Sequence, residues 1–355
     1  MIFPHNKADS NTIQIIAFGK GVGESFLIHI GCDRYILIDS FINAETKNPV
    51  CLDYLYNVGL DESAIVGVVC SHWDDDHVKG MSLVLNRIKN DIDVCIPLLL
   101  SKRDIATFLA FHENARVESN SSSEFVKVWR LKETKTNMRF VFASSKTALF
   151  DDKLVEIGKE HSSIISLSPT NDDVEHFIKD IILPKNNTPM VSTNITSNAI
   201  STVTLITGIV DGVLFGGDLE NDNHAWDEIA KRFCYDKCHI FKVPHHGSEN
   251  AFCRDIWGKV VEKPISLITR YNRSSLPKDE MVNQILQESS CVYILGGEKS
   301  REKKHTLRCL RGTVADVLSR IEIRDKQIGI VRLSWNDKEW SVEQFGAVEC
   351  IIPPA

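Results

Sequence analysis

One short segment, Ser71–His77, constrains this chain more than any other. It places His72 and His77 at either side of three aspartates, directly after the apolar run Ala64–Cys70. An apolar run of that length predicts a buried strand, which would deliver the polar side chains to one point at the edge of a sheet. Carboxylate and imidazole together suit divalent ions such as zinc, manganese or iron. A solvated acidic turn that caps a helix would account for an aspartate or two, but not for a histidine at both ends.

Two later apolar runs also end in side chains that bind metals. The run Val213–Gly217 leads into Asp218, and the run that starts at Cys238 leads into His245 and His246. Taken singly, each of these is an ordinary turn residue. Three strands with such endings, separated by helical patterns, predict an α/β fold whose strand ends share one metal centre.

The N-terminal region reads as three strands with a glycine-rich connection. The strands are expected at Ile13–Phe18, Phe26–Ile30 and Tyr35–Ser40, and the connection is Gly19–Ser25. The glycine spacing fits neither a Walker A loop nor a dinucleotide fingerprint, and no helix pattern follows it. We therefore expect a chain reversal between two sheet strands rather than a nucleotide-binding loop.

The bulk composition bounds the class of protein. The 355 residues are 43% hydrophobic and 25% charged, and the net charge of -7 excludes a globally basic nucleic-acid binder. A local basic groove stays compatible with that charge. No run approaches the ~18 apolar residues of a membrane span, and no signal peptide is visible. We expect a cytoplasmic protein whose ten cysteines are reduced, without a membrane segment.

The order of the motifs resembles that of the metallo-β-lactamase superfamily. The superfamily motif His-x-His-x-Asp-His corresponds to His72–His77, with Asp74 in the place of the second histidine. The late Gly-Asp corresponds to Gly217-Asp218, and the terminal histidine motif to Val243–Ser248. Within the superfamily, the aspartate substitution and the His-His-Gly-Ser ending are most similar to the soluble hydrolase domain of ComEC-type DNA-uptake proteins.

This resemblance implies an α/β fold of the metallo-β-lactamase type, an αββα four-layer sandwich. It implies a hydrolase domain over residues 1–300. Because the pattern of the region near 101–163 is weak, we expect an insertion there that shapes substrate access. We expect residues 301–355 to form a strand-rich C-terminal extension packed on the same domain.

The resemblance also implies two divalent metal ions, zinc or manganese, that share a bridging hydroxide. The first would be held by His72 and Asp74, and Asp218 would bridge. The second would be held by Asp76, His77 and one of the two later histidines, of which His245 is favoured over His246 because it is nearest the strand end. The residues expected to act directly in catalysis are Asp76, His77 and Asp218.

Further residues are expected around the metals. Asp39, at the end of the third strand, would hydrogen-bond a ligand histidine. Asn198 occupies the place of a histidine that many superfamily members supply, so the first site could be weak or prefer manganese. Ser201 completes an Asn-x-x-Ser segment that ComEC-type domains share. Arg270 and Asn272, after a predicted strand, could contact substrate.

The leading functional hypothesis is a phosphodiesterase or nuclease acting on DNA, without the membrane channel that accompanies the ComEC-type domain. The basic stretch Lys299–His305 could follow a nucleic-acid backbone, although a solvated surface explains it equally well. One alternative is a hydrolase of a small ester, thioester, lactone or cyclic nucleotide, since one fold hosts many chemistries. Another is a non-catalytic binding or regulatory module, which Asn198 motivates. A partner protein or a homo-oligomer is left open.

Overall fold

Two eight-stranded sheets form the centre of the molecule. A computed structural model describes residues 3–98, 120–157, 161–182, 197–208, 212–221, 224–297, 328–336 and 338–353. The first sheet has the order β15-β14-β1-β2-β3-β4-β5-β6, and the second β16-β13-β12-β11-β10-β9-β8-β7. The first sheet comprises β1 Ile13–Gly19, β2 Glu24–Gly31, β3 Arg34–Ile38, β4 Ile65–Val69, β5 Ile92–Pro97, β6 Met138–Ala143, β14 Gly329–Trp335 and β15 Trp340–Gly346. The second comprises β7 Thr147–Leu149, β8 Ser163–Ser166, β9 Thr204–Thr207, β10 Gly212–Phe215, β11 Cys238–Lys242, β12 Val261–Thr269, β13 Cys291–Leu295 and β16 Val348–Ile351.

The strands carry apolar side chains on both faces, because each sheet packs against the other sheet on one face and against helices on its outer face. Along β2, Phe26 and Ile28 point into the core between the sheets, and Leu27 points into the core on the other face. In β10, Val213 and Phe215 face the other sheet, whereas Leu214 faces the second outer core. Since side chains alternate along a strand, a continuous apolar run is what two buried faces require.

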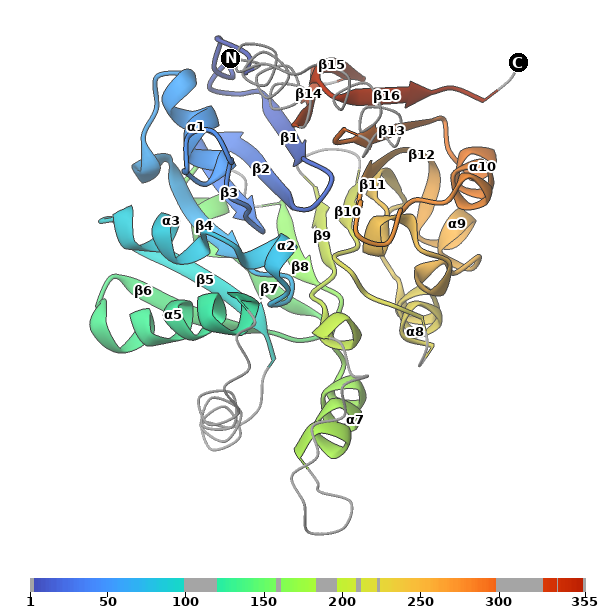
Figure 1. Cartoon of the computed structure of the whole chain (residues 1–355), viewed down its shortest axis with the longest axis horizontal. Helices are drawn as coiled ribbons and strands as arrows, with labels where there is room; N and C mark the ends of the chain where they lie inside the picture. The colour runs from blue at the N-terminus through green and yellow to red at the C-terminus, as the bar shows by residue number, and fades with distance from the viewer. Residues whose placement is uncertain are drawn as a thin grey trace, which may run out of the picture.

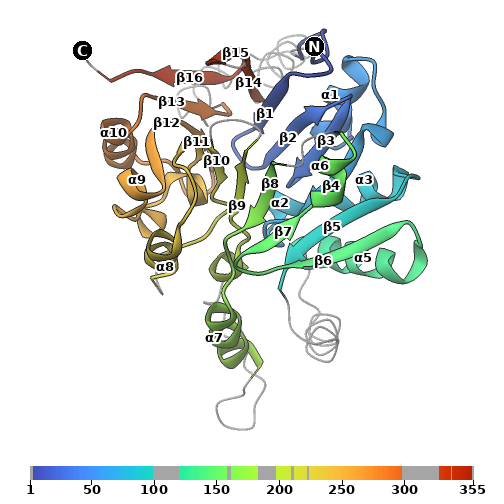
Figure 2. The same ribbon diagram turned by 180° about the vertical axis from the view of Figure 1, so that it is seen from behind.

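Helices cover the two outer faces. Helices α1 Val50–Asn57, α3 Met81–Arg87 and α5 Asn120–Thr134 lie on the first sheet, and α8 Ala225–Arg232, α9 Ile256–Lys259 and α10 Asp279–Glu288 lie on the second (Figures 1 and 2). The four layers are therefore helix, sheet, sheet and helix, as expected from the sequence. The remaining elements are the helix α7 Asn171–Ile182 and the short helices η1 Glu62–Ala64, α2 Asp75–Val78, α6 Asp151–Val155, η2 Ser197–Ile200, η3 Pro244–Gly247 and η4 Glu249–Ala251.

Both sheets contain a run of parallel strands, and these position the site. Strands β3 to β6 are parallel in the first sheet, and β10 to β13 in the second. At the N-terminus, β1 and β2 pair antiparallel, so the glycine-rich segment reverses the chain as expected. Residues 198–206 continue the apolar pattern of a strand, but they do not form one continuous strand. The first of these residues form the short helix η2, and only Thr204–Thr207 pair in the sheet.

The proposed insertion and C-terminal extension both contribute strands. From the region 101–163, β6 and β7 form one edge of the first and second sheet respectively, and residues 101–119 lie outside the described part. From the region 301–355, β14 and β15 join the first sheet and β16 joins the second. The basic stretch Lys299–His305 lies outside the described residues. The nine cysteines that the structure describes are all free thiols.

We predict that Gly67→Ala destabilises the fold by about 1–3 kcal/mol through overpacking. A Cβ at Gly67 would lie 2.7 Å from the ring of the buried Phe150, so that the ring must move. The free energy of unfolding, measured with urea, checks this. Adding Phe150→Leu should restore part of the loss in the Gly67→Ala background, whereas additive losses would contradict this account.

Candidate metal centre

The candidate metal centre lies where parallel strands of both sheets end. In the first sheet, Asp39 follows β3 and the segment His72–His77 follows β4. In the second, Asp218 follows β10, His246 follows β11 and Thr269 ends β12. Because the carboxyl ends of parallel strands meet at one edge, residues from distant parts of the sequence come together there.

The segment after β4 is anchored by Trp73. Its buried ring lies 5.4 Å from the ring of Phe125 in α5 and 5.7 Å from that of Phe177 in α7, measured between centroids. The neighbouring His72 is completely buried. Aromatic packing of Trp73 therefore fixes the loop that presents His72 and Asp74.

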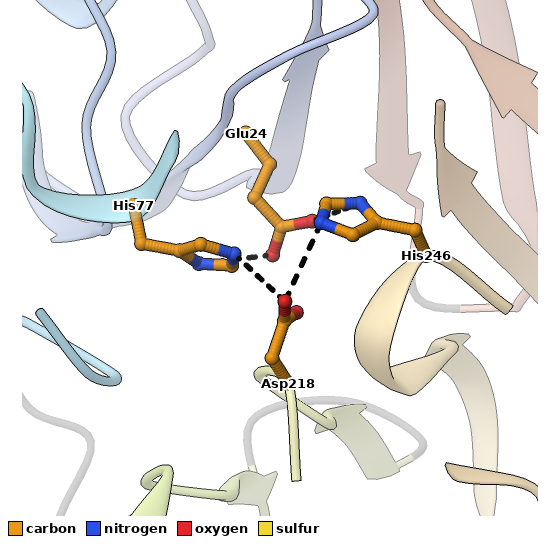
Figure 3. Close-up of side chains that lie close together, drawn as sticks. All are labelled: Glu24, His77, Asp218 and His246. Atoms are coloured by element: carbon orange, nitrogen blue, oxygen red, sulfur yellow. Dashed lines mark ion pairs between the residues drawn. The ribbon is translucent and has the colours of Figure 1, made fainter. Parts of the chain in front are cut away.

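Asp218 is the point on which the imidazoles converge (Figure 3). Its Oδ2 lies 3.3 Å from His77 Nε2, 3.4 Å from His246 Nε2 and 4.0 Å from His72 Nε2. Asp76 lies beside it, with Oδ2 at 3.0 Å from His246 Nε2 and 3.6 Å from His77 Nε2. These five side chains, from three separate segments, surround one small volume.

The opposite ring nitrogens of the same histidines are already engaged. His77 Nδ1 lies 2.7 Å from Asp39 Oδ2, and His246 Nδ1 lies 3.0 Å from the carbonyl oxygen of Thr269. His72 Nδ1 lies 3.0 Å from Ser71 Oγ. An Nδ1–H that donates to a carboxylate or carbonyl leaves Nε2 with its lone pair, which is the usual arrangement of a metal-binding histidine.

The residues present fit a cation at this position. His72 Nε2 and His77 Nε2 are buried and make no hydrogen bond within the described residues. A buried imidazole nitrogen without a partner is costly, and a metal ion would satisfy it. The facing carboxylates of Asp76 and Asp218 would in turn be neutralised. The donor set therefore suits a divalent transition-metal ion.

The electrostatics of the site agree with this fit. Burial, together with the neighbouring His77, lowers the pKa of His72 to about 3, so its imidazole is neutral at pH 7 and free to act as a ligand. For His246, burial alone would lower the pKa, but the carboxylates of Asp218 and Asp76 outweigh it and raise the pKa to about 10. Negative charge at this point thus attracts a proton, which a metal ion would displace on binding.

Asp74 has a partly exposed side chain, whereas Asn198 is buried. Asp74 Oδ2 lies 4.0 Å from His72 Nε2, and its Oδ1 accepts a hydrogen bond from Ser197 at 2.6 Å. The Asn198 amide donates to Glu220 at 3.0 Å, while its Oδ1 is buried without a hydrogen-bond partner. Ser201 Oγ accepts from the backbone N–H of Asp218 at 3.0 Å and so helps to orient the Asp218 turn.

Of the two consecutive histidines, His246 rather than the favoured His245 lies at the cluster. His246 is buried against Asp76 and Asp218, whereas His245 Nδ1 lies 3.1 Å from Glu220 Oε1, away from that group. The reason is the backbone. Both residues have left-handed φ values, 44° and 54°, so the chain turns sharply and exchanges the directions of the two side chains. Proximity to the strand end is therefore a poor guide here.

The expected substrate contacts are engaged elsewhere in the fold. Arg270 Nη2 lies 2.5 Å from Glu349 Oε2, which ties the end of β12 to β16. The Asn272 side-chain amide donates to the carbonyl oxygen of Gly297 at 2.9 Å. Both residues hold the loop that follows β12, and any contact with substrate stays a prediction.

Sequence reasoning missed a buried ion network behind the centre. Lys242 Nζ, in the last position of β11, lies 2.6 Å from Glu24 Oε1 and 3.3 Å from Asp218 Oδ1, and donates to the carbonyl oxygen of Gly217 at 2.6 Å. Thr269 donates to the second oxygen of Glu24. Burial alone would lower the pKa of Lys242, but Glu24 and Asp218 raise it, so the ammonium stays charged. A lysine within the apolar run Ile240–Val243 was the available signal in the sequence.

Glu24 lies close enough to His77, Asp218 and His246 for one ion to touch all four (Figure 3). Both of its oxygens, however, already face Lys242 or Thr269. We therefore interpret Glu24 as the counter-ion of Lys242, which in turn holds Asp218 Oδ1 and leaves Oδ2 directed at the imidazoles.

The chain belongs to the metallo-beta-lactamase superfamily, whose family model matches residues 18–253. That match includes β2 to β11 and the clustered side chains of His72, Asp76, His77, Asp218 and His246. The chain therefore carries the fold of metal-dependent hydrolases together with a candidate metal-binding cluster. No curated protein matches the sequence significantly.

Several solved structures are similar to this chain at low identity. They include Tm1679, a metal-dependent hydrolase of the beta-lactamase superfamily, at 13% identity and a TM-score of 0.44, with 78% of this chain and 93% of that chain covered. Zinc-bound PqqB from Methylobacterium extorquens is 8% identical, with a TM-score of 0.36 and coverage of 64% and 71%. The metallo-beta-lactamase SMB-1 is 11% identical, with a TM-score of 0.34 and coverage of 69% and 81%.

Among the described residues, no helix combines the length and the apolar character that a membrane crossing needs.

We predict that Lys242→Met lowers the free energy of unfolding by about 3–5 kcal/mol, because it leaves Glu24 and Asp218 buried without their cation. Urea denaturation of the metal-free protein measures this. Lys237→Met is the matched control, since Lys237 forms an ion pair with Glu262 at the exposed surface; it should change stability by less than about 1 kcal/mol. Adding Glu24→Gln to Lys242→Met should recover part of the loss. If Lys242→Met and Lys237→Met lowered the free energy of unfolding equally, the stabilising role of the buried ion network would be contradicted.

Proposed function

We propose that this protein is a dinuclear metal-dependent phosphodiesterase that acts as a nuclease on DNA. The observation that carries the proposal is the convergence of the Nε2 atoms of His72, His77 and His246 on one oxygen of Asp218. A carboxylate surrounded in this way is suited to bridge two cations. The hydrolase class follows from the superfamily, and the phosphodiester substrate is our inference.

The ligands divide into two groups around Asp218. We assign His72 and Asp74 to the first ion, and Asp76, His77 and His246 to the second, with Asp218 between them. His245 is left outside, paired with Glu220. With bound zinc or manganese, such a pair of ions activates water and stabilises charge on a phosphoryl oxygen.

The protein's own residues keep this arrangement rigid. Asp39 and Thr269 fix the rings of His77 and His246 through their Nδ1 atoms. Lys242 holds Asp218 from behind. These supporting side chains are buried, so water does not compete for their hydrogen bonds to the ligands.

The choice of a nuclease rests on the motifs that resemble ComEC-type hydrolase domains. Asp74 in the second histidine position and the ending His245–Ser248 are the residues that carry that likeness. The same fold hosts ester, lactone and cyclic-nucleotide hydrolases, so the substrate requires a direct assay.

We predict that His246→Ala lowers DNA cleavage by at least about 10³-fold and removes roughly one equivalent of metal, because it deletes a ligand of the second ion. His245→Ala, the matched control next to it, should retain activity within about 10-fold and both metal equivalents, because His245 faces Glu220. Cleavage of a labelled oligonucleotide and metal quantification on the same samples measure both. A larger loss of cleavage and metal in His245→Ala than in His246→Ala would contradict the assignment of His246 as the ligand.

We predict that saturating zinc or manganese raises the melting temperature of the metal-free protein. Ions that bind only the folded state contribute about 4 kcal/mol at a thousandfold excess over Kd. The shift should be largely lost in Asp218→Ala, which removes the bridging carboxylate, and retained in Glu220→Ala. An absence of any shift in the unmodified protein would favour a non-catalytic module.

A substrate screen separates the remaining alternatives. Metal-loaded protein is incubated with single- and double-stranded DNA, a cyclic dinucleotide, a lactone and a thioester. Hydrolysis of DNA supports the proposal. Turnover of a lactone or thioester alone, with DNA intact, would replace it with a small-molecule hydrolase.

A further inference from the structure

An open cavity of about 380 Å³ adjoins the metal centre. It is lined by the turn that joins β1 to β2, by the segment 75–79 and by the loop after β12. Three of its lining side chains are cationic, Lys20, Lys79 and Arg273, and one is acidic, Asp75. The cavity is thus locally basic in a chain whose net charge is -7.

Two other described cavities differ in character. A cavity beneath α9 and α10 is lined almost entirely by apolar and aromatic side chains. Another, of about 610 Å³, is lined by Asp33, Asp61, Asp91 and Glu156 together with two cations. Of these three cavities, the excess of positive charge therefore occurs in the one beside the metal centre.

The cationic side chains of this cavity are not neutralised by a salt bridge within the described residues. Lys20 Nζ donates to the carbonyl oxygen of Ile42 at 2.5 Å and lies 4.7 Å above the ring of Phe41. Among the described residues, Lys20, Lys79 and Arg273 form no salt bridge, and the charge of Asp75 in the same lining acts on Lys79 and Arg273 from a longer range. Burial, and secondarily the charge of Lys79, lowers the pKa of Lys20 to about 8. A bound anion would relieve this repulsion.

The walls of the cavity are built by specific backbone contacts. The N–H of Asn272 donates to the carbonyl oxygen of Gly21 at 2.6 Å, and the Asn272 side chain holds Gly297. Gly21 has a φ of +83°, and a Cβ there would lie 2.2 Å from Asn272 Nδ2. Tyr271 and Leu276 exchange backbone hydrogen bonds that close the loop carrying Arg273. The glycine turn and this loop therefore meet closely to place Lys20 and Arg273 at one opening.

Two lining segments of the cavity also reach the metal centre, through Tyr271, which precedes Asn272, and through Asp75. The Tyr271 ring stacks on His246 at 5.0 Å between centroids, with 16° between the planes. Burial and the nearby Asp76 raise the pKa of the Tyr271 hydroxyl, and a hydrogen bond from Arg273 partly offsets this. Asp75, which lines the cavity, immediately precedes Asp76 in α2. A ligand spanning both places would pass along Tyr271.

We propose that this cavity binds a backbone phosphate of a nucleic-acid strand, next to the phosphodiester presented to the metal centre. This deepens, and rests on, the proposed nuclease function. Arg273 and Lys79 are exposed, so a strand could enter and leave the cavity on its solvent side. Guanidinium and ammonium groups are the usual partners of phosphate, and Tyr271 offers a face on which a base could stack.

The test compares two pairs of substitutions that remove the same charge. Lys79→Gln with Arg273→Gln removes two cations from the cavity, and Lys89→Gln with Arg232→Gln removes two exposed cations outside its lining. Binding of a fluorescein-labelled 12-nucleotide DNA is followed by anisotropy in EDTA, which prevents metal-dependent cleavage. We expect Kd to rise about 10-fold for the cavity pair, with a salt slope smaller by about one to two. The control pair should change Kd by less than about twofold. Equal changes in both pairs, or none in the cavity pair, would overturn the proposal.

Two further experiments distinguish a backbone phosphate from free phosphate, and the cavity proposal from the proposed nuclease function. Inorganic phosphate, thymidine monophosphate and unlabelled DNA are compared as competitors at equal phosphate concentration. If either small molecule displaces the oligonucleotide as effectively as unlabelled DNA, the assignment to a backbone phosphate is overturned. With metal, the cavity pair should lower kcat/KM for DNA about 10-fold but leave that for bis(p-nitrophenyl) phosphate, a single phosphodiester, within about twofold. Absence of any phosphodiester hydrolysis by the unmodified protein would reject the proposed function, while the binding arm would still test the cavity.

Discussion

The candidate centre depends on the way in which the Asp218 carboxylate is held. One oxygen faces the buried ammonium of Lys242, and the other faces the Nε2 atoms of three histidines. Lys242 is itself balanced by Glu24, on the opposite sheet. A buried carboxylate without such a partner would be strongly destabilising, so this network joins the stability of the fold to the geometry of the site. The two sheets meet around one chain of charges rather than around apolar contacts alone.

The position of the site could be predicted from the sequence because it follows strand ends. Apolar runs mark buried strands, and parallel strands bring their ends to one edge, so His72–His77 and Asp218 could be placed together without coordinates. The distinction between His245 and His246 could not, because it depends on two consecutive left-handed residues that no hydrophobic pattern encodes. The Glu24–Lys242 pair was equally hidden, since it joins β2 of one sheet to β11 of the other. Pairings of this kind are tertiary and leave no periodic trace.

The basic cavity gives the proposed function a physical basis that net charge alone could not provide. The sequence directed attention to Arg270 and to the stretch Lys299–His305. Arg270 is paired with Glu349, and the basic stretch lies outside the described residues. Instead Lys20, Lys79 and Arg273, from three separate segments, line one opening beside the metal centre. An acidic protein can recognise a polyanion when cations are gathered beside the site of chemistry.

Anomalous diffraction from crystals grown with manganese or zinc tests the central claim most directly. We expect two peaks about 3.5–4 Å apart, one on either side of Asp218, as in two-metal hydrolytic centres. One ion should be bound by His72 and Asp74, and the other by Asp76, His77 and His246 through its Nε2 atom. A site without anomalous signal, or an ion bound instead between His245 and Glu220, would contradict the account.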